Sequence, residues 1–217
     1  SFTDGVALEG SIDLENDQAG FADENHIPVK HILGEFIVDD KGTVKIEDIG
    51  VGLLKDGSID VSGSIDTAQD QLKLALGINN TGADDFVRQN IAGRLNGSID
   101  VKGETSSPVV NWNLDSGFAR TDGMLFFQTD KQLGQRTLKL DKVRLVPQNG
   151  GELNAKGSLE LFKDRKLQLD IVSKAFNPAR IDPQLPQGSV NGNINLTGIL
   201  TQEKFAGKMQ FAPSTLN

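Results

Sequence analysis

Apolar and polar residues alternate along most of this 217-residue chain. Successive side chains of a β-strand point to opposite faces, so each alternating run predicts a strand with one apolar and one polar face. The apolar residues of these runs are Val6, Leu8, Ile12 and Leu14; Val44 and Ile46; Ile59, Val61 and Ile65; Leu72, Leu74, Leu76 and Ile78; Leu95, Ile99 and Val101; Val110, Trp112 and Leu114; Leu138 and Leu140; Leu153, Leu159 and Leu161; Leu167, Leu169 and Ile171; and Val190, Ile194 and Leu196. The pattern predicts an all-β fold.

Turn-forming residues separate the runs, as a meander of strands requires. They lie at residues 39–42, 55–57, 106–108, 148–151 and 163–165.

Two segments do not alternate. Residues 83–91 are expected to form a short helix, with Asp84 and Asp85 near its N-terminus. Residues 176–187 contain three prolines, which excludes a central strand. We therefore predict one continuous β segment over residues 1–217, with candidate block boundaries near residues 81–93 and 176–188.

Glycines recur six residues apart, with the same parity as the neighbouring apolar residues, so each pair is expected on the apolar face of its strand. Glycine inside a strand marks a bulge, a bend or the close approach of another group. The glycines either let the sheet coil on itself or keep its concave side open for a guest, and the sequence leaves both interpretations open. The four pairs are Gly57 and Gly63, Gly97 and Gly103, Gly151 and Gly157, and Gly192 and Gly198.

One part of the sequence repeats. Residues 95–114 align without a gap to residues 190–209, which indicates a repeated strand–turn–strand unit. The separation between similar segments varies elsewhere, so the sequence predicts a loose array rather than a strict solenoid.

Composition argues against several classes of protein. The net charge is −8 and basic residues are scattered, whereas a nucleic-acid-binding protein presents a basic stripe. No apolar stretch approaches the ~20 residues of a membrane-spanning helix. The chain has one tryptophan and no tyrosine, which argues against the aromatic girdles of an outer-membrane barrel. The absence of cysteine excludes disulfides and thiolate metal sites. Because the chain starts at Ser1 without a signal peptide, we expect a segment of a longer protein.

No catalytic constellation is evident in the sequence, and no cofactor is expected. His26 and His31 are interpreted as surface or packing residues rather than metal ligands. The acidic pairs at residues 39–40 and 84–85 fit turns. Residues 50–52, Gly-Val-Gly, lack the strand–helix setting of a nucleotide-binding loop. No serine lies in a nucleophile-elbow motif.

The segment at residues 176–198 resembles the recurring block of the TamB family, within the AsmA-like group. The block has an aromatic residue followed by Pro-Ala, here Phe176 and residues 178–179, then a proline-glycine turn and an alternating strand with two glycines. Gln187 stands where the turn usually has glycine. Residues 95–114 are similar to a second copy without the Pro-Ala phrase, and together the match covers about a third of the chain.

This resemblance implies an open apolar trough, or β-taco, formed by a long sheet that curls lengthwise. It also implies a protein that is anchored in the bacterial inner membrane and reaches through the periplasm to an outer-membrane barrel partner of the TamA type. The roles implied are phospholipid transport in outer-membrane biogenesis, and the assembly or secretion of outer-membrane proteins such as autotransporters.

An apolar trough suits phospholipid acyl chains, because about sixteen methylenes at ~0.8 kcal/mol each cost ~13 kcal/mol when exposed to water. The eight paired glycines are expected to shape this groove. An ordinary β-sandwich shows the same alternation. The predicted groove lining is Ile59, Val61, Ile65, Leu95, Ile99, Val101, Val110, Trp112, Leu114, Leu138, Leu140, Leu153, Leu159, Leu161, Leu167, Leu169, Ile171, Val190, Ile194 and Leu196.

Three hypotheses follow. In the first, the protein is a non-catalytic conduit that shields acyl chains. In the second, it is a chaperone-like module that offers a sheet edge or groove to nascent outer-membrane proteins. In the third, it is a closed β-sandwich or repeat adhesin with a filled core.

Overall fold

The computed structural model describes residues 8–88, 93–130, 135–162, 164–180 and 184–216. Of the residues discussed above, Val6, Ile91, Lys163 and Pro183 lie outside these ranges. The chain divides into unit 1, residues 1–108 with 114–116, and unit 2, residues 109–113 with 117–217. The candidate block boundaries near residues 81–93 and 176–188 fall inside unit 1 and unit 2 respectively.

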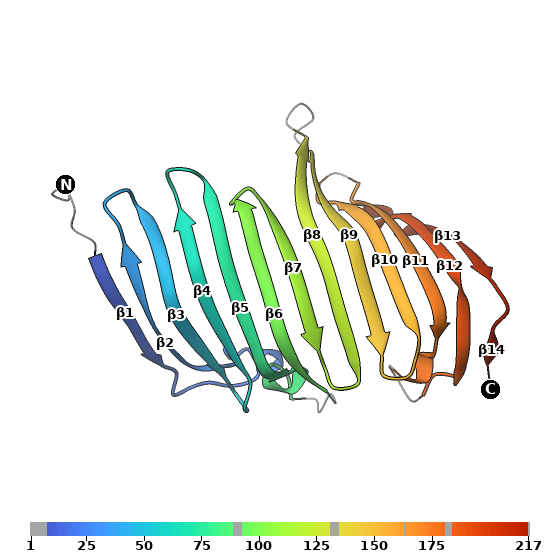
Figure 1. Ribbon diagram of the computed structural model, residues 1–217, viewed down its shortest axis with the longest axis horizontal. Helices are drawn as coiled ribbons and strands as arrows, with labels where there is room; N and C mark the ends of the chain where they lie inside the picture. The colour runs from blue at the N-terminus through green and yellow to red at the C-terminus, as the bar shows by residue number, and fades with distance from the viewer. Residues whose placement is uncertain (1–7, 89–92, 131–134, 163, 181–183, 217) are drawn as a thin grey trace. The chain divides into compact units, whose positions relative to one another are not determined.

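Unit 1 is an open antiparallel sheet whose strands follow one another in sequence order (Figure 1). Its strands are β1 (Leu8–Glu15), β2 (Val29–Val38), β3 (Thr43–Leu53), β4 (Ser58–Asp66), β5 (Gln71–Gly82) and β6 (Arg94–Glu104).

Unit 2 has the same architecture, and β8 to β13 pair in sequence order. The residues of β7 (Ser107–Asp115) are divided between the two units. The strands of unit 2 are β8 (Ala119–Asp130), β9 (Gln135–Pro147), β10 (Glu152–Glu160), β11 (Lys166–Phe176), β12 (Gly188–Ile199), β13 (Lys204–Phe211) and β14 (Thr215–Leu216), which pairs with the start of β12.

The pairing register places apolar residues opposite apolar residues. In unit 1, Ile59 lies between Val51 of β3 and Ile78 of β5. In unit 2, Ile194 lies between Ile171 of β11 and Met209 of β13. Directly opposed side chains share a face of the sheet, so each unit has one apolar and one polar face.

Bulges keep the apolar residues on one face of the sheet where strict alternation fails. The β3–β4 register shifts between Ile46 and Ile49, and the β9–β10 register shifts between Leu140 and Val143. Such a bulge inserts extra residues into one strand. Ile46 and Ile49, one even-numbered and one odd-numbered, therefore lie on the same face of the sheet, on either side of the bulge. Leu140 and Val143 do the same in unit 2.

Neither unit is a closed sandwich, which corrects the third hypothesis in its sandwich form. In the described residues no second sheet packs on either face, and Leu53, Ile78 and Ala119 are the buried apolar side chains, at 2%, 8% and 7% exposure. The other apolar residues of the strands are half-buried by their neighbours or exposed. Alternation alone does not distinguish a sheet with a partner layer from a sheet without one.

Short 3₁₀ segments stand where the alternation fails. The helix expected over residues 83–91 is wrong for its described part, residues 83–88, where a 3₁₀ turn, η2 (Ala83–Asp85), forms instead, while residues 89–91 lie outside the described residues. The proline-rich segment carries η3 (Pro178–Arg180) and, as predicted, is not a central strand. The break expected at residues 106–108 is shorter than predicted, since β7 already begins at Ser107. The described residues include no helix long and apolar enough to cross a bilayer.

A buried carboxylate ties η2 to the turn between β3 and β4. Asp85 is completely buried, and it accepts hydrogen bonds from the backbone N–H groups of Gly82 (2.7 Å), Lys55 (3.1 Å) and Gly57 (3.4 Å) and from Arg94 Nη1 (2.6 Å). These partners satisfy the charge of a group that would be costly to bury alone.

The neighbouring carboxylate extends the same network. Asp84 accepts from Lys55 Nζ at 2.8 Å and from Arg94 Nη2 at 3.4 Å. The hydrogen bond from Lys55 and the nearby charge of Arg94 hold the pKa of Asp84 below its ordinary value, against the opposing effect of burial.

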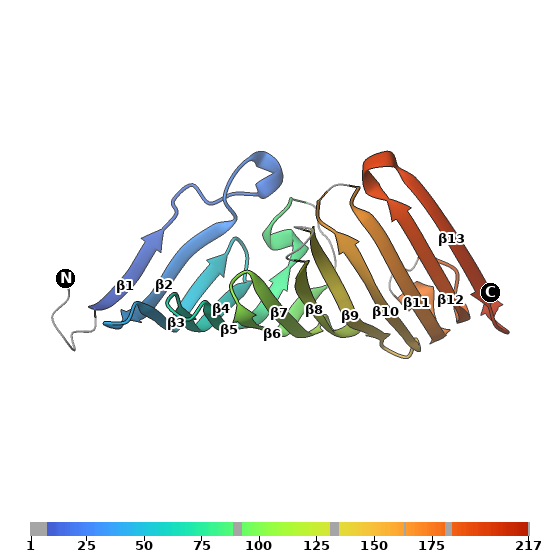
Figure 2. The same ribbon diagram turned by 90° about the horizontal axis from the view of Figure 1, so that it is seen from above.

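The connection between β1 and β2 reaches this network across the ends of the intervening strands (Figures 1 and 2). It contains η1 (Ala22–Glu24), whose Ala22 N–H donates to the Phe86 carbonyl at 2.7 Å. Glu24 forms an ion pair with Arg88 at 2.7 Å. One end of unit 1 is therefore closed by contacts between segments about sixty residues apart in sequence.

We expect Asp85→Ala to lower the free energy of unfolding by about 3–5 kcal/mol, because Arg94 and three backbone donors lose their acceptor. Urea unfolding followed by circular dichroism measures the loss. Asp100→Ala is the matched control, because Asp100 forms only an exposed ion pair with Lys102 and should change stability by less than about 1 kcal/mol. Equal losses in the two variants would contradict the assigned role of Asp85.

Candidate functional site

The apolar face of unit 1 gathers the groove residues predicted there. Val61 pairs with Leu76 of β5, which pairs in turn with Ile99 of β6. The same ladders place the other predicted residues on this face. The six are Ile59, Val61, Ile65, Leu95, Ile99 and Val101.

The apolar face of unit 2 gathers a second group. Leu169 lies between Gly157 of β10 and Leu196 of β12. Leu161 lies just beyond the end of β10, and its N–H donates to the Arg136 carbonyl at 2.8 Å. The predicted residues on this face are Leu138, Leu140, Leu153, Leu159, Leu167, Leu169, Ile171, Val190, Ile194 and Leu196.

The predicted residues of β7 share one side of that strand. Val110, Trp112 and Leu114 alternate along β7, although Leu114 belongs to unit 1 and the other two to unit 2. The Trp112 ring lies over Gly123 of β8, where an added Cβ would come within 2.2 Å of it. Trp112 Nε1 donates to Thr121 Oγ1 at 3.3 Å. The tryptophan is therefore held on the apolar face of unit 2.

The predicted lining was shorter than these faces. It left out residues that the alternation had already placed on an apolar side, namely Leu8, Ile12, Leu14, Val44, Ile46, Leu72, Leu74, Leu76 and Ile78 in unit 1. Other residues were missed because period two was applied without bulges, although Ile46 and Ile49 differ in parity within one apolar strand, and because the phenylalanines and the edge strands were not considered. These are Ile32, Phe36, Val38, Ile49, Val51 and Leu53 in unit 1, and Leu125, Phe127, Val143, Leu145, Phe205, Met209 and Phe211 in unit 2.

The predicted groove glycines lie where the neighbouring strand comes close. A Cβ on Gly63 would lie 2.0 Å from the Lys73 carbonyl oxygen, and its φ of +137° is itself unfavourable for other residues. A Cβ on Gly157 or Gly192 would lie 2.3 or 2.5 Å from a carbonyl oxygen of the adjacent strand. At these positions glycine permits the close approach of the neighbouring strand.

The other glycines of the set are used in related ways. A Cβ added to Gly57 would lie 2.6 Å from the Asp85 carboxylate, and a Cβ added to Gly198 would lie 2.5 Å from the Phe205 ring. Gly97, Gly103 and Gly151 have positive φ values of 144°, 115° and 71°. Wherever their surroundings are described, the space beside these glycines is filled by the protein itself.

The apolar faces nevertheless stay open along most of their length. Among the strand residues, the exposure of large apolar side chains is greatest at the outer strands, with Leu14 of β1 at 57% and Met209 and Phe211 of β13 at 63% and 66%. Among the described residues, η2 lies at one end of the face of unit 1, where the Asp85 carboxylate occupies the space beside Gly57. In unit 2, the segment that leads into η3 contacts the turn after β9, where the Asn177 N–H donates to the Gly150 carbonyl at 2.7 Å. The described part of each unit therefore presents an aliphatic surface that is bounded at one end.

The groups considered for catalysis have structural roles. The rings of His26 and His31 lie over Gly20 and Gly52. The carboxylate of Asp39 accepts from the Lys41 and Thr43 N–H groups at 3.0 and 2.8 Å, and the bond from Thr43 holds the pKa of Asp39 below its ordinary value. Residues 50–52 are part of strand β3. In the part of the chain that the structure describes, no three His, Asp or Glu side chains are grouped to hold a metal ion.

We expect Gly63→Ala to lower the free energy of unfolding by about 1–3 kcal/mol, because the new methyl group collides with the backbone of β5. Gly77→Ala is the control. The nearest atom to a Cβ on Gly77 is 3.6 Å away, so this change should be neutral within about 0.5 kcal/mol or slightly stabilising. Denaturant melts of both variants provide the comparison. If Gly63→Ala were also neutral, the glycine would not be needed for strand approach.

Comparison with family models, with curated proteins and with solved structures found no match to this chain.

Proposed function

We propose that the protein is a non-catalytic lipid-binding segment whose apolar faces shield phospholipid acyl chains from water. The observation that carries this proposal is the open aliphatic face of each unit, which lacks a covering layer in the described residues. A soluble protein rarely exposes contiguous apolar surface without a use for it. An acyl chain laid on this surface would regain about 0.8 kcal/mol for each methylene removed from water.

The dimensions and chemistry of the faces suit an acyl chain. A strand of nine residues such as β4 spans about 30 Å, about twice the depth of one leaflet of a bilayer. The face-forming side chains are mainly Leu, Ile and Val, with few polar groups to orient a ligand. Contact of this kind selects for apolar length rather than for a particular functional group.

Matching internal geometry supports repeated strand–turn–strand units. Residues 152–160 of β10 correspond to residues 58–66 of β4 at a separation of 94, and η3 corresponds to η2 at a separation of 95. The bulges after Ile46 and Leu140 also match, as do those after Ile78 and Ser173. The separation is thus nearly constant over a longer stretch than the sequence alignment indicated.

The family resemblance extends the proposal to a cellular setting. In this setting the sheet is a β-taco trough in the periplasm, within a protein anchored in the inner membrane and associated with a TamA-type barrel. Lipid would move along the trough toward the outer membrane without any bond being made or broken. The resemblance at residues 176–198 and the open apolar faces support this setting.

A second candidate function is a chaperone-like role for nascent outer-membrane proteins, and it is favoured by strand β13. All eight of its residues are exposed, and within the described residues β13 pairs on one side only, with β12. An unpaired edge offers backbone hydrogen bonds to an extended segment of another chain.

Photo-crosslinking residues at positions 99 and 194 test the two functions. Positions 100 and 195 are the matched controls, because each is adjacent on the same strand and faces the opposite side. In cells we expect phospholipid adducts at 99 and 194 and far fewer at 100 and 195. Unfolded outer-membrane polypeptide captured at 99 and 194 without lipid would favour the chaperone role. Equal lipid capture at all four positions would contradict lipid binding by the apolar face.

An open face also predicts that charge is tolerated there. Ile99→Asp should retain the circular dichroism spectrum of the native protein and lose about 1–2 kcal/mol of stability, because Ile99 is only half-buried. Leu53→Asp is the contrasting variant. Leu53 is 2% exposed, so an unpaired charge there should cost about 4 kcal/mol or more. Loss of the native spectrum in Ile99→Asp would indicate a closed core instead.

A further inference from the structure

Charge is distributed very unequally between the two units. Unit 1 contains 21 acidic and 8 basic residues, a formal charge of −13, whereas unit 2 contains 9 acidic and 14 basic residues, a charge of +5. The two values add to the net charge of −8. The low overall isoelectric point therefore conceals a basic unit, and such asymmetry points to an anionic partner.

The scaffold itself does not require this basic character. At matching positions of the two units, Asp48 corresponds to Lys142, Asp60 to Asn154 and Asp100 to Asn195. Pairing and bulges are conserved between the units while these charges change. The basic residues of unit 2 are therefore not needed for strand pairing and are available to bind a ligand.

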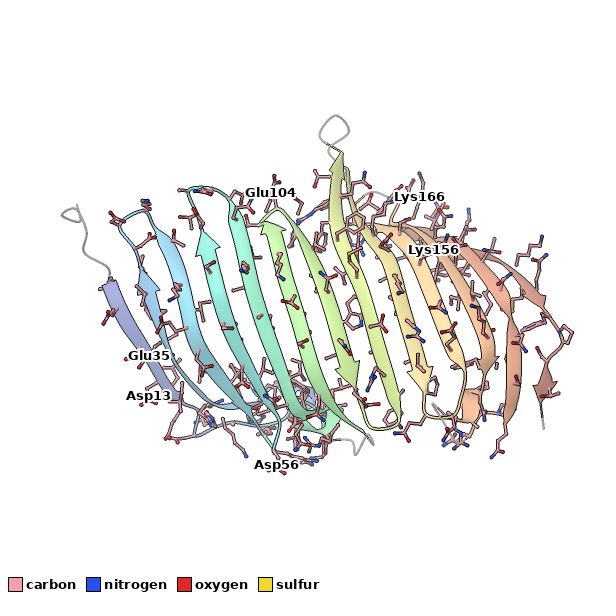
Figure 3. The ribbon with its side chains drawn as sticks, viewed as in Figure 1. Asp13, Glu35, Asp56, Glu104, Lys156 and Lys166 are labelled. Carbon is pink, nitrogen blue, oxygen red and sulfur yellow. The ribbon has the colours of Figure 1, made fainter. Side chains whose placement is uncertain are left out.

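A cavity of about 560 Å³ lies where β9, β11 and β13 begin and β10 and β12 end. Three lysines line it, namely Lys139, Lys166 and Lys204, together with one acid, Glu160. Figure 3 shows Lys166 at this end of the strands. The lining charge is thus +2.

Neutral hydrogen-bonding groups also line the cavity, beside the apolar residues Leu167, Ile199, Phe205 and Ala206. The polar face carries a row across the sheet in which Lys139 lies opposite Ser158, Ser158 opposite Gln168, and Gln168 opposite Thr197. All four residues line the cavity. Hydroxyl and amide donors next to ammonium groups suit an anion with several acceptor oxygens.

The three lysines are not neutralised by ion pairs. Among the described residues, Lys139, Lys166 and Lys204 form no salt bridge. The matching row of unit 1 differs in this respect. There Lys45 pairs with Glu47 at 2.9 Å and Lys102 with Asp100 at 3.3 Å. Two lysines of the unit 1 row are thus paired with carboxylates, whereas Lys139, the lysine of the matching unit 2 row, has no such partner among the described residues.

We propose that this cavity of unit 2 binds a phosphate-bearing anion. A phosphate monoester carries about −1.5 to −2 at neutral pH, which matches the lining charge of +2, and it presents three acceptor oxygens. The site lies on the polar side of the sheet and at the strand ends, so it is independent of acyl binding by the apolar face. The phosphate would come either from a free phosphate compound or from an anionic lipid headgroup.

Calorimetric titration of the whole chain with inorganic phosphate and with glycerol 3-phosphate at low salt tests the site. We expect binding that weakens as salt is added, and a loss of at least about tenfold in affinity in the variant Lys139→Gln, Lys166→Gln, Lys204→Gln. The control is Lys45→Gln, Lys73→Gln, Lys102→Gln, which removes the same number of lysines from the polar face of unit 1, in the row that matches Lys139, and should leave affinity unchanged. Circular dichroism verifies that both variants remain folded.

Sedimentation with vesicles distinguishes the two sources of phosphate. Binding to phosphatidic acid vesicles but not to phosphatidylcholine vesicles, lost in the unit 2 variant alone, would identify an anionic lipid headgroup. Calorimetric binding of inorganic phosphate or glycerol 3-phosphate, without binding to vesicles, would identify a free phosphate compound. Equal loss in both triple variants, no loss in the unit 2 variant, or the absence of binding to every probe would overturn the proposal.

Discussion

The antiparallel register of backbone hydrogen bonds is the constraint on which the other features of this protein depend. A slip by one residue between two strands would move the apolar side chains of one strand to the polar face. Pairs such as Ile59 with Ile78, and Ile171 with Ile194, show that the register holds across each unit. The bulges near Ile49 and Val143 preserve it where the sequence changes parity. The separation of the two faces is therefore a property of backbone pairing as much as of composition.

Glycines and 3₁₀ segments adapt these sheets without adding a second layer. At Gly63 and Gly157 the adjacent backbone occupies the space of a side chain, so the strands approach more closely than other residues allow. At one end of each unit, η2 or η3 folds back on a hairpin turn. In unit 1 the buried Asp85 secures this closure by accepting from three backbone donors and Arg94. The hydrogen bonds of Asp85 thus stabilise this end of unit 1, in addition to the packing of side chains on its half-buried apolar face.

The two faces of a sheet without a covering layer are available for different chemistry. The aliphatic face offers contact area without directional groups, which suits acyl chains. The polar face carries charges that pairing does not restrict, and the two units use this freedom in opposite ways. Unit 1 pairs Lys45 with Glu47 and Lys102 with Asp100, while unit 2 leaves Lys139, Lys166 and Lys204 around a cavity. A phosphate site on one side and an apolar surface on the other can therefore coexist in one thin structure.

The sequence by itself determined the all-β class and most of the residues that share an apolar face, because period two along a strand is a local property. The turns at residues 39–42 and 148–151 were predictable for the same reason. The bulges, the 3₁₀ turn at Ala83–Asp85 where a helix was expected to start, and the absence of a second layer over the described residues were decided only by tertiary structure. These features depend on which strand lies next to which, as the contacts of Gly57 with Asp85 and of Trp112 with Gly123 illustrate. Alternation reports which side of a strand is apolar, but only the packing of distant segments decides whether that side is covered.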